Sequence, residues 1–146
     1  MNRKFIFKFI FPIAVFCLIF INTICQNKNE TVDEDMGDFT SEDISSEKFY
    51  EMIKTANPDY IIVDFRTENE YKSGYIENSI NIDYYSENLK DILNALNKEK
   101  TYLIYCRSGN RSGKVLPIMK SLGFKTIYNM SGGIIDWNSK EFPLKK

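Results

Sequence analysis

Short apolar runs alternate with helical patterns from residue 45 to the end of the chain. Four runs are rich in β-branched and aromatic residues and are predicted to be buried strands: 60–66, 79–84, 101–106 and 125–130. Helices are predicted in the five stretches between and around these runs, from apolar residues at helical spacing or from helix-end signals: 45–58, 67–76, 86–100, 109–124 and 131–144. This alternation predicts an α/β fold, with a mostly parallel central sheet and helices on both faces.

Signals for helix ends support this reading. Thr67 precedes Glu70 at the spacing of a capping box, and Gly74 is expected to end that short helix. Ser86 is predicted to cap the next helix. Pro117 lies inside a helical pattern, where it is expected to kink or delay the helix.

The carboxyl ends of two predicted strands carry the residues best suited to chemistry. One strand ends in Val-Asp-Phe-Arg with Asp64 and Arg66, and the other ends in Tyr-Cys with Cys106. Sites in parallel sheets lie at this edge, so the three side chains are expected to be able to converge. Asp64 and Arg66 by themselves are also typical of a structural ion pair.

The N-terminal segment has the pattern of a secretory signal. Three basic residues occur within the first eight positions, and an apolar run follows from Phe9 to Ile21. An anchor that stays in the membrane is the alternative, although the run is short of the ~20 residues of a span and contains Pro12. Residues 1–25 are therefore predicted to be a signal peptide, a lipoprotein signal or an anchor.

Cys25 closes this segment, and the order of elements resembles that of a bacterial lipoprotein, in which such a cysteine carries lipid. Residues 26–43 hold seven acids and one lysine, which predicts a solvated tether before a domain at 44–146. The domain is expected to be exported to a bacterial periplasm or held at the outer side of a membrane. Any membrane contact would pass through the N-terminal segment or a lipid on Cys25.

Charge and composition exclude several kinds of function. The chain carries a net charge of −1, and residues 44–146 contain 15 basic and 13 acidic residues, so no basic surface for nucleic acid is expected. The chain has no histidine, which removes the usual general base and the commonest metal ligand. Cys106 is the one cysteine of the domain, so thiolate zinc sites of the usual spacing are excluded and no metal is expected.

The stretch Cys-Arg-Ser-Gly-Asn-Arg-Ser at residues 106–112, here called the cysteine loop, follows a predicted strand and opens a predicted helix. Backbone N–H groups of such a loop can converge on one point, where they form a concavity that binds anions. The same donors, together with Arg107 and Arg111, would favour a Cys106 thiolate. The loop therefore predicts a nucleophile that needs no general base, although a lone cysteine at a strand end is often only a small buried side chain.

From about Ile44 to Leu144 the chain resembles a single rhodanese domain, the sulfurtransferase fold. The family's Cys-Arg-x-Gly-x-Arg-Ser/Thr loop is complete at residues 106–112. Its upstream elements are matched by VDFRTENEYKSGYIENSINI and its later ones by LGFKTIYNMSGGIIDW. Tyr75 stands where the family usually has a histidine.

The resemblance implies a three-layer fold and sulfur transfer without a cofactor. Four residues separate Cys106 from Arg111, whereas phosphatases and arsenate reductases of related fold have five, so those activities are disfavoured. Cys106 would take sulfur from a small anionic donor such as thiosulfate and pass it to a thiol, cyanide or protein acceptor. A relay or partner-binding module without turnover is the alternative.

The resemblance also implies roles for the cysteine loop. Arg107 would hold the donor's sulfonate, and Arg111 would orient the loop, with Asp64 as a candidate partner. Backbone N–H groups from Arg107 to Arg111 would stabilise the persulfide, which makes the whole loop the expected binding site: Arg107, Ser108, Gly109, Asn110, Arg111 and Ser112.

Overall fold

The computed structural model of the protein describes residues 39–55 and 59–146. The predicted signal, the lipidation candidate Cys25 and most of the predicted tether lie outside the described residues. Within the described ranges, no helix is long and apolar enough to cross a membrane.

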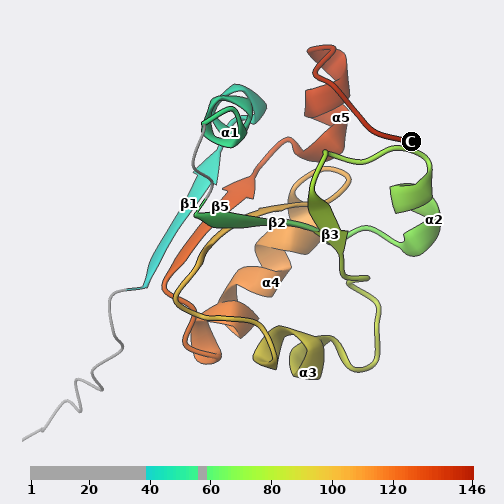
Figure 1. Ribbon diagram of the computed structural model, residues 1–146. Coiled ribbons are helices and arrows are strands. Elements are labelled where there is room, and N and C mark those ends of the chain that lie inside the picture. Colours follow the sequence, from blue (N-terminus) through green and yellow to red (C-terminus); the bar gives the residue numbers. More distant parts are fainter. Residues whose placement is uncertain (1–38, 56–58) are drawn as a thin grey trace, which may run out of the picture. The chain divides into compact units, whose positions relative to one another are not determined.

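The core of the domain is a sheet of five parallel strands, as Figure 1 shows. The strands are β1 (Thr40–Ile44), β2 (Tyr60–Asp64), β3 (Ser79–Asn81), β4 (Thr101–Tyr105) and β5 (Thr126–Met130). Their order across the sheet is β1-β5-β4-β2-β3, and every neighbouring pair is parallel. The predicted α/β class with a mostly parallel sheet is confirmed, and the four strands predicted from apolar runs are present.

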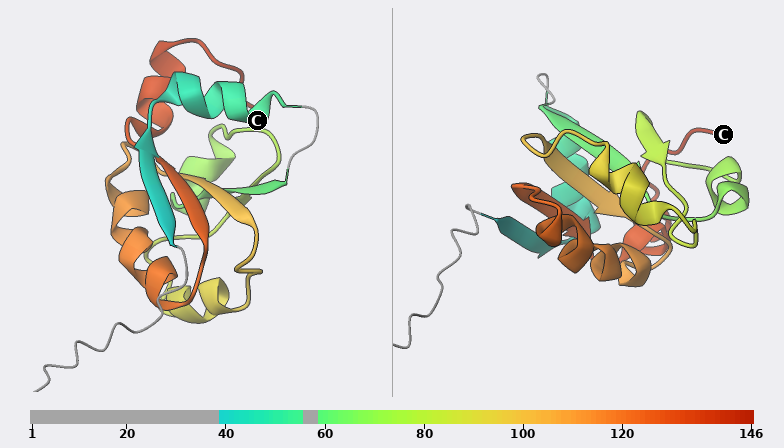
Figure 2. Two further views of the ribbon diagram at one scale, coloured as in Figure 1. Left: turned by 90° about the vertical axis from the view of Figure 1, so that its left-hand side faces the viewer. Right: turned by 90° about the horizontal axis from the view of Figure 1, so that it is seen from below.

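Helices cover both faces of this sheet, which gives the three layers expected (Figures 1 and 2). Helices α1 (Ser46–Ile53) and α5 (Gly133–Ser139) pack on one face with Phe49 and Trp137 in the core. Helices α3 (Leu89–Asn94) and α4 (Asn110–Ser121) pack on the other face with Leu93 and Val115. The short α2 (Glu68–Lys72) follows β2.

The domain begins earlier than the sequence predicts. Residues 40–43, which the tether was expected to include, form most of β1, and the strand pairs with β5 from Thr40 opposite Thr126 to Ile44 opposite Met130. Four of the five residues of β1 are exposed, because it is an edge strand. Its side chains therefore carry no apolar pattern, and backbone hydrogen bonds to β5 hold it in the sheet.

Helix ends agree with the sequence only in part. The capping box at Thr67 is present, since its side chain accepts the Glu70 N–H while the Glu70 carboxylate accepts the Thr67 N–H. Ser86 is not the cap predicted: α3 begins at Leu89 after Asn88, because Ser86 forms a turn in which its carbonyl accepts the Leu89 N–H. Helix α4 starts without delay and continues through Pro117.

Candidate active site

Cys106 lies directly between β4 and the turn that opens α4, as the sequence predicts. The start of α5 donates backbone hydrogen bonds to this turn. The Ile134 N–H donates to the Cys106 carbonyl at 2.9 Å, and the Ile135 N–H donates to the Arg107 carbonyl at 3.1 Å. The path of the cysteine loop is therefore fixed by a helix that is distant in sequence.

Gly109 at the N-cap of α4 has a φ of 84°, a conformation that glycine adopts without strain. A Cβ at this position would lie 2.2 Å from the Ser131 carbonyl oxygen. The loop backbone thus approaches the chain after β5 so closely that only glycine fits.

The Cys106 thiol is buried at the start of the cysteine loop. The residue is 1% exposed and forms no disulfide. Burial acts to raise the pKa of the thiol, but hydrogen bonds from the Ser112 hydroxyl and from the N–H groups of Ser112, Ser108 and Arg111 outweigh it, so the pKa is lowered. The Cys106 thiol therefore ionises more readily than an ordinary cysteine, and the thiolate is the nucleophilic form.

We expect the alkylation rate of Cys106 by iodoacetamide to rise with pH, with a midpoint below the ordinary cysteine pKa of about 8.5. Ser112→Ala removes the side chain with the largest lowering effect on the thiol pKa, together with its hydrogen bond to the Gly109 carbonyl, and should move this profile toward higher pH. Ser121→Ala, at the exposed end of the same helix, is the control. An unshifted profile for Ser112→Ala would show that the hydroxyl does not set the thiol pKa.

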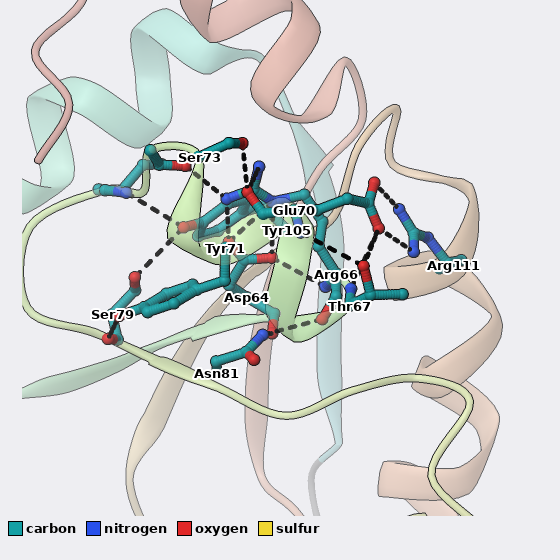
Figure 3. A network of polar contacts seen from close by, with 12 residues as sticks. Asp64, Arg66, Thr67, Glu70, Tyr71, Ser73, Ser79, Asn81, Tyr105 and Arg111 are labelled. Carbon is teal, nitrogen blue, oxygen red and sulfur yellow. Dashed lines mark hydrogen bonds and ion pairs between the residues drawn. The ribbon is translucent and has the colours of Figure 1, made fainter. Parts of the chain in front are cut away.

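Arg111 is paired with Glu70 and not with Asp64, the partner that the sequence suggested. Its Nη1 and Nη2 donate to the two carboxylate oxygens of Glu70, each at 2.7 Å, as Figure 3 shows. The Arg111 guanidinium is the main cause that lowers the pKa of Glu70 to about 2. Because this pairing joins α2 to α4, Arg111 anchors the cysteine loop, which agrees with an orienting role.

Asp64 and Arg66 do not converge with Cys106. Both are buried and form an ion pair, with Arg66 Nη2 2.6 Å from Asp64 Oδ2. Side chains alternate along a strand, so Asp64 shares the sheet face of Ile62, whereas Cys106 lies in the cluster of the opposite face. The pair is therefore a structural ion pair, the alternative given for Asp64 and Arg66 in the sequence analysis.

The buried ion pair nevertheless influences the site through α2. Arg66 Nη1 and Nη2 donate to the backbone carbonyls of Glu70 at 3.0 Å and Gly74 at 2.7 Å (Figure 3). These bonds hold the helix that carries the Glu70 carboxylate. Glu70 is a site residue that the sequence analysis did not predict. Its role in the capping box could be predicted, but its ion pair with Arg111, 41 positions away, could not.

Glu70 makes the stability of the domain depend on pH. Its pKa falls from an ordinary value of about 4.3 in the unfolded chain to about 2 in the folded domain, so the ion pair contributes above pH 4.3 and is lost as the pH falls toward 2. At pH 6 we expect the unfolding free energy of wild type to be larger than that of Glu70→Gln. This difference should shrink as the pH is lowered from 4.3 to 2. Urea unfolding at several pH values measures this, and a difference that did not change with pH would contradict the role of the ion pair.

A cavity of about 550 Å³ opens over the cysteine loop. Its lining comes from α2, the loop and the segment before α3: Thr67, Glu70, Tyr85, Arg107, Ser108, Asn110 and Arg111. Ser108 and Arg111, which line it, also direct N–H groups at the thiol. Within the described part of the chain, no group of three or more carboxylate or cysteine side chains could hold a metal ion.

A thiol of lowered pKa, at the carboxyl end of a parallel strand and at the start of a helix, defines a cysteine-centred α/β domain. The family model of the rhodanese-like domain matches residues 45–140. The chain therefore belongs to the rhodanese-like family.

Known proteins similar to this chain include bacterial and plant members. A tRNA uridine(34) hydroxylase of Photorhabdus laumondii is 36% identical over 69% of this chain, which spans only 29% of that protein. Rhodanese-like domain-containing protein 17 of Arabidopsis thaliana is 34% identical over 63% of this chain and 67% of its own length. A rhodanese-related protein of Thermoplasma volcanium has a similar structure, with a TM-score of 0.62 and 31% identity over 71% of this chain and 97% of that one.

Proposed function

We propose that the protein is a sulfurtransferase that moves a sulfane sulfur through a persulfide on Cys106. The observation that carries the proposal is the place of Cys106 between β4 and the first turn of α4, where the Ser108, Arg111 and Ser112 N–H groups lower the pKa of its thiol. A thiolate in this position is a nucleophile without a general base, which suits a chain that has no histidine. Similarity to proteins named as enzymes also supports catalysis.

The reaction has two halves. In the first, the Cys106 thiolate attacks the outer sulfur of a donor such as thiosulfate, the S–S bond of the donor breaks, and sulfite leaves with the electron pair. In the second, a thiol, cyanide or protein acceptor attacks the outer sulfur of the Cys106 persulfide and restores the thiolate. No cofactor takes part in either half.

The cysteine loop serves both halves by electrostatics. Its N–H groups face the thiolate and would stabilise the anionic persulfide that replaces it. Arg107 is exposed, lines the cavity and is our candidate for the group that holds the sulfonate of the donor. Arg111 is already paired with Glu70, so its contribution is the position of the loop.

Cys106→Ser should abolish persulfide formation. The purified protein is incubated with thiosulfate under non-reducing conditions and its intact mass is measured. We expect a gain of one sulfur atom in wild type, which cyanide reverses, and no gain in Cys106→Ser. A domain that is folded and keeps its thiol, yet gains no sulfur, would contradict the transferase and favour a binding module without turnover.

We also propose that the domain is exported and held at a membrane through its N-terminal segment or a lipid on Cys25. The basic start and apolar run of residues 1–25 support this proposal. The near-neutral domain supports a protein or small-molecule partner over nucleic acid. Fractionation of cells that express wild type or Cys25→Ala tests the location, and a cytoplasmic wild-type protein of unchanged length would overturn it.

A further inference from the structure

The backbone carbonyl of Gly109, at the N-cap of α4, has three hydrogen-bond donors around it. The Gly113 N–H donates to it at 2.9 Å, the Ser112 hydroxyl at 3.2 Å, and the Asn129 side-chain amide at 3.5 Å. A carbonyl oxygen has two lone pairs, and the bond from Gly113 uses one of them. The Ser112 hydroxyl and the Asn129 amide therefore share the other.

The Ser112 hydroxyl has a choice between two acceptors. It carries a single hydrogen, so it can donate either to the Gly109 carbonyl or to the sulfur of Cys106. Ser112 is fully buried, so solvent does not replace the hydroxyl at the carbonyl when the hydroxyl turns to the sulfur. A second donor at the Gly109 carbonyl therefore favours the orientation in which Ser112 serves Cys106.

Asn129, on β5, is the side chain that supplies this second donor, and its orientation is fixed by a carboxylate. Its Nδ2 donates at 2.7 Å to Oδ1 of Asp43, its partner in the register of β1 and β5. A Cβ added at Gly113 would lie 3.6 Å from Nδ2, so the amide packs against the first turn of α4. The reverse orientation would direct Oδ1 at the Asp43 carboxylate and the Gly109 carbonyl, which only accept hydrogen bonds.

The orientation of the Asn129 amide has a cost elsewhere in the same group. Asn129 is 3% exposed, and within the described part of the chain its Oδ1 is the one buried side-chain polar atom without a hydrogen-bond partner. Buried polar atoms are normally paired. An amide that leaves its own oxygen unpaired while its nitrogen faces the cysteine loop points to a role for the nitrogen.

We propose that Asn129 is a positioning residue for Cys106 and acts through the Ser112 hydroxyl. Its amide satisfies the Gly109 carbonyl, and Ser112 is then free to donate to the sulfur. This inference deepens the proposed function, on which its catalytic meaning rests, because a stabilised thiolate is the form that attacks the sulfur donor. It also connects β1 and β5 to the chemistry of a loop that follows β4.

The inference concerns hydrogen bonding and not charge. The charged groups on the elements around the thiol are Arg107 in the loop, Arg111 on α4, Glu70 on α2, Asp83 before α3, Asp136 on α5 and Asp43 on β1. Arg111 interacts with the Cys106 thiolate and is neutralised by Glu70. Replacement of the uncharged Asn129 side chain removes none of these charges, so a change in thiol reactivity on its loss would come from the hydrogen bonds.

The test measures the pH profile of Cys106 alkylation by iodoacetamide in the full chain, followed on the peptide that contains Cys106. Asn129→Ala should move the midpoint toward higher pH by about 0.5 unit, because the Ser112 hydroxyl then turns to the Gly109 carbonyl. In a Ser112→Ala background the same substitution should give no further shift. Asn129→Leu keeps a large side chain without a donor and should reproduce both results if the alanine variant does not fold.

Asn81→Ala is the matched control. Its Nδ2 also donates to two backbone carbonyls, those of Asp64 at 3.0 Å and Arg66 at 2.8 Å, and its loss should leave the midpoint unchanged. An unshifted midpoint on loss of Asn129, or an equal shift with and without the Ser112 hydroxyl, would overturn the inference. Alkylation needs no sulfur donor, so the proposed function is judged separately: a wild type that gains no sulfur from thiosulfate would contradict the transferase whatever the alkylation profiles.

Discussion

Gly109→Ala is expected to abolish sulfur transfer and to destabilise the domain by about 2–5 kcal/mol. A residue with a side chain at a φ of 84° lowers the unfolding free energy by roughly 1–2 kcal/mol. The backbone shift needed to separate the new Cβ from the Ser131 carbonyl lowers it by about 1–3 kcal/mol more. Any shift of the loop also turns the N–H groups of Ser108 and Arg111 away from the thiol. Loss of one such donor typically lowers a rate by about 10²–10³-fold.

Gly123→Ala is a matched control for this prediction. Gly123 has the same φ of 84°, but a Cβ there would meet nothing within 4 Å. Gly123→Ala should therefore lower the unfolding free energy only by the cost of its backbone conformation, roughly 1–2 kcal/mol, and should keep full activity. Urea unfolding and the thiosulfate reaction measure the two effects, and equal destabilisation of both variants would show that the contact with Ser131 is unimportant.

Arg66→Ala is the second substitution for which we expect a large effect, a destabilisation of about 3–5 kcal/mol. It leaves the fully buried Asp64 carboxylate without its partner, and it removes the donors to the Glu70 and Gly74 carbonyls. Because these bonds hold α2, the Glu70–Arg111 pair should also loosen. Partial loss of sulfur transfer is expected even where the variant remains folded.

The exposed pair between Lys72 and Glu68 provides the control for Arg66. Lys72→Ala breaks an ion pair on the surface of the same α2 helix and should change the unfolding free energy by less than about 1 kcal/mol. Unfolding by urea at pH 7 compares the two variants. If Arg66→Ala were as stable as Lys72→Ala, the buried pair would not hold the region between β2 and β3.

The local sequence was sufficient to predict most of the architecture. The strands β2, β4 and β5 lie inside the sheet and are largely apolar because both faces of a parallel sheet are covered, so a few neighbouring residues are enough to predict each of them. The Thr67–Glu70 capping box and the cysteine loop are likewise local, since their residues lie within a single turn. The Cys106 thiol could be located for the same reason.

Features that depend on distant segments could not be predicted in this way. Strand β1 has no apolar pattern, because its place at the edge depends on backbone hydrogen bonds to β5. The ion pair of Arg111 with Glu70 joins two helices that the order of the strands brings together. The sheet face on which Asp64 points, away from Cys106, follows from strand register.

The sequence by itself thus determined the α/β class and the position of the Cys106 thiol between a strand and a helix, because periodicity and loop composition are encoded by neighbouring residues. Only the tertiary structure decided which charge neutralises Arg111, why the loop needs Gly109 against Ser131, and that Tyr85 lines the cavity. Those contacts join residues that are distant along the chain. Their partners are selected by packing across the sheet, which no local pattern records.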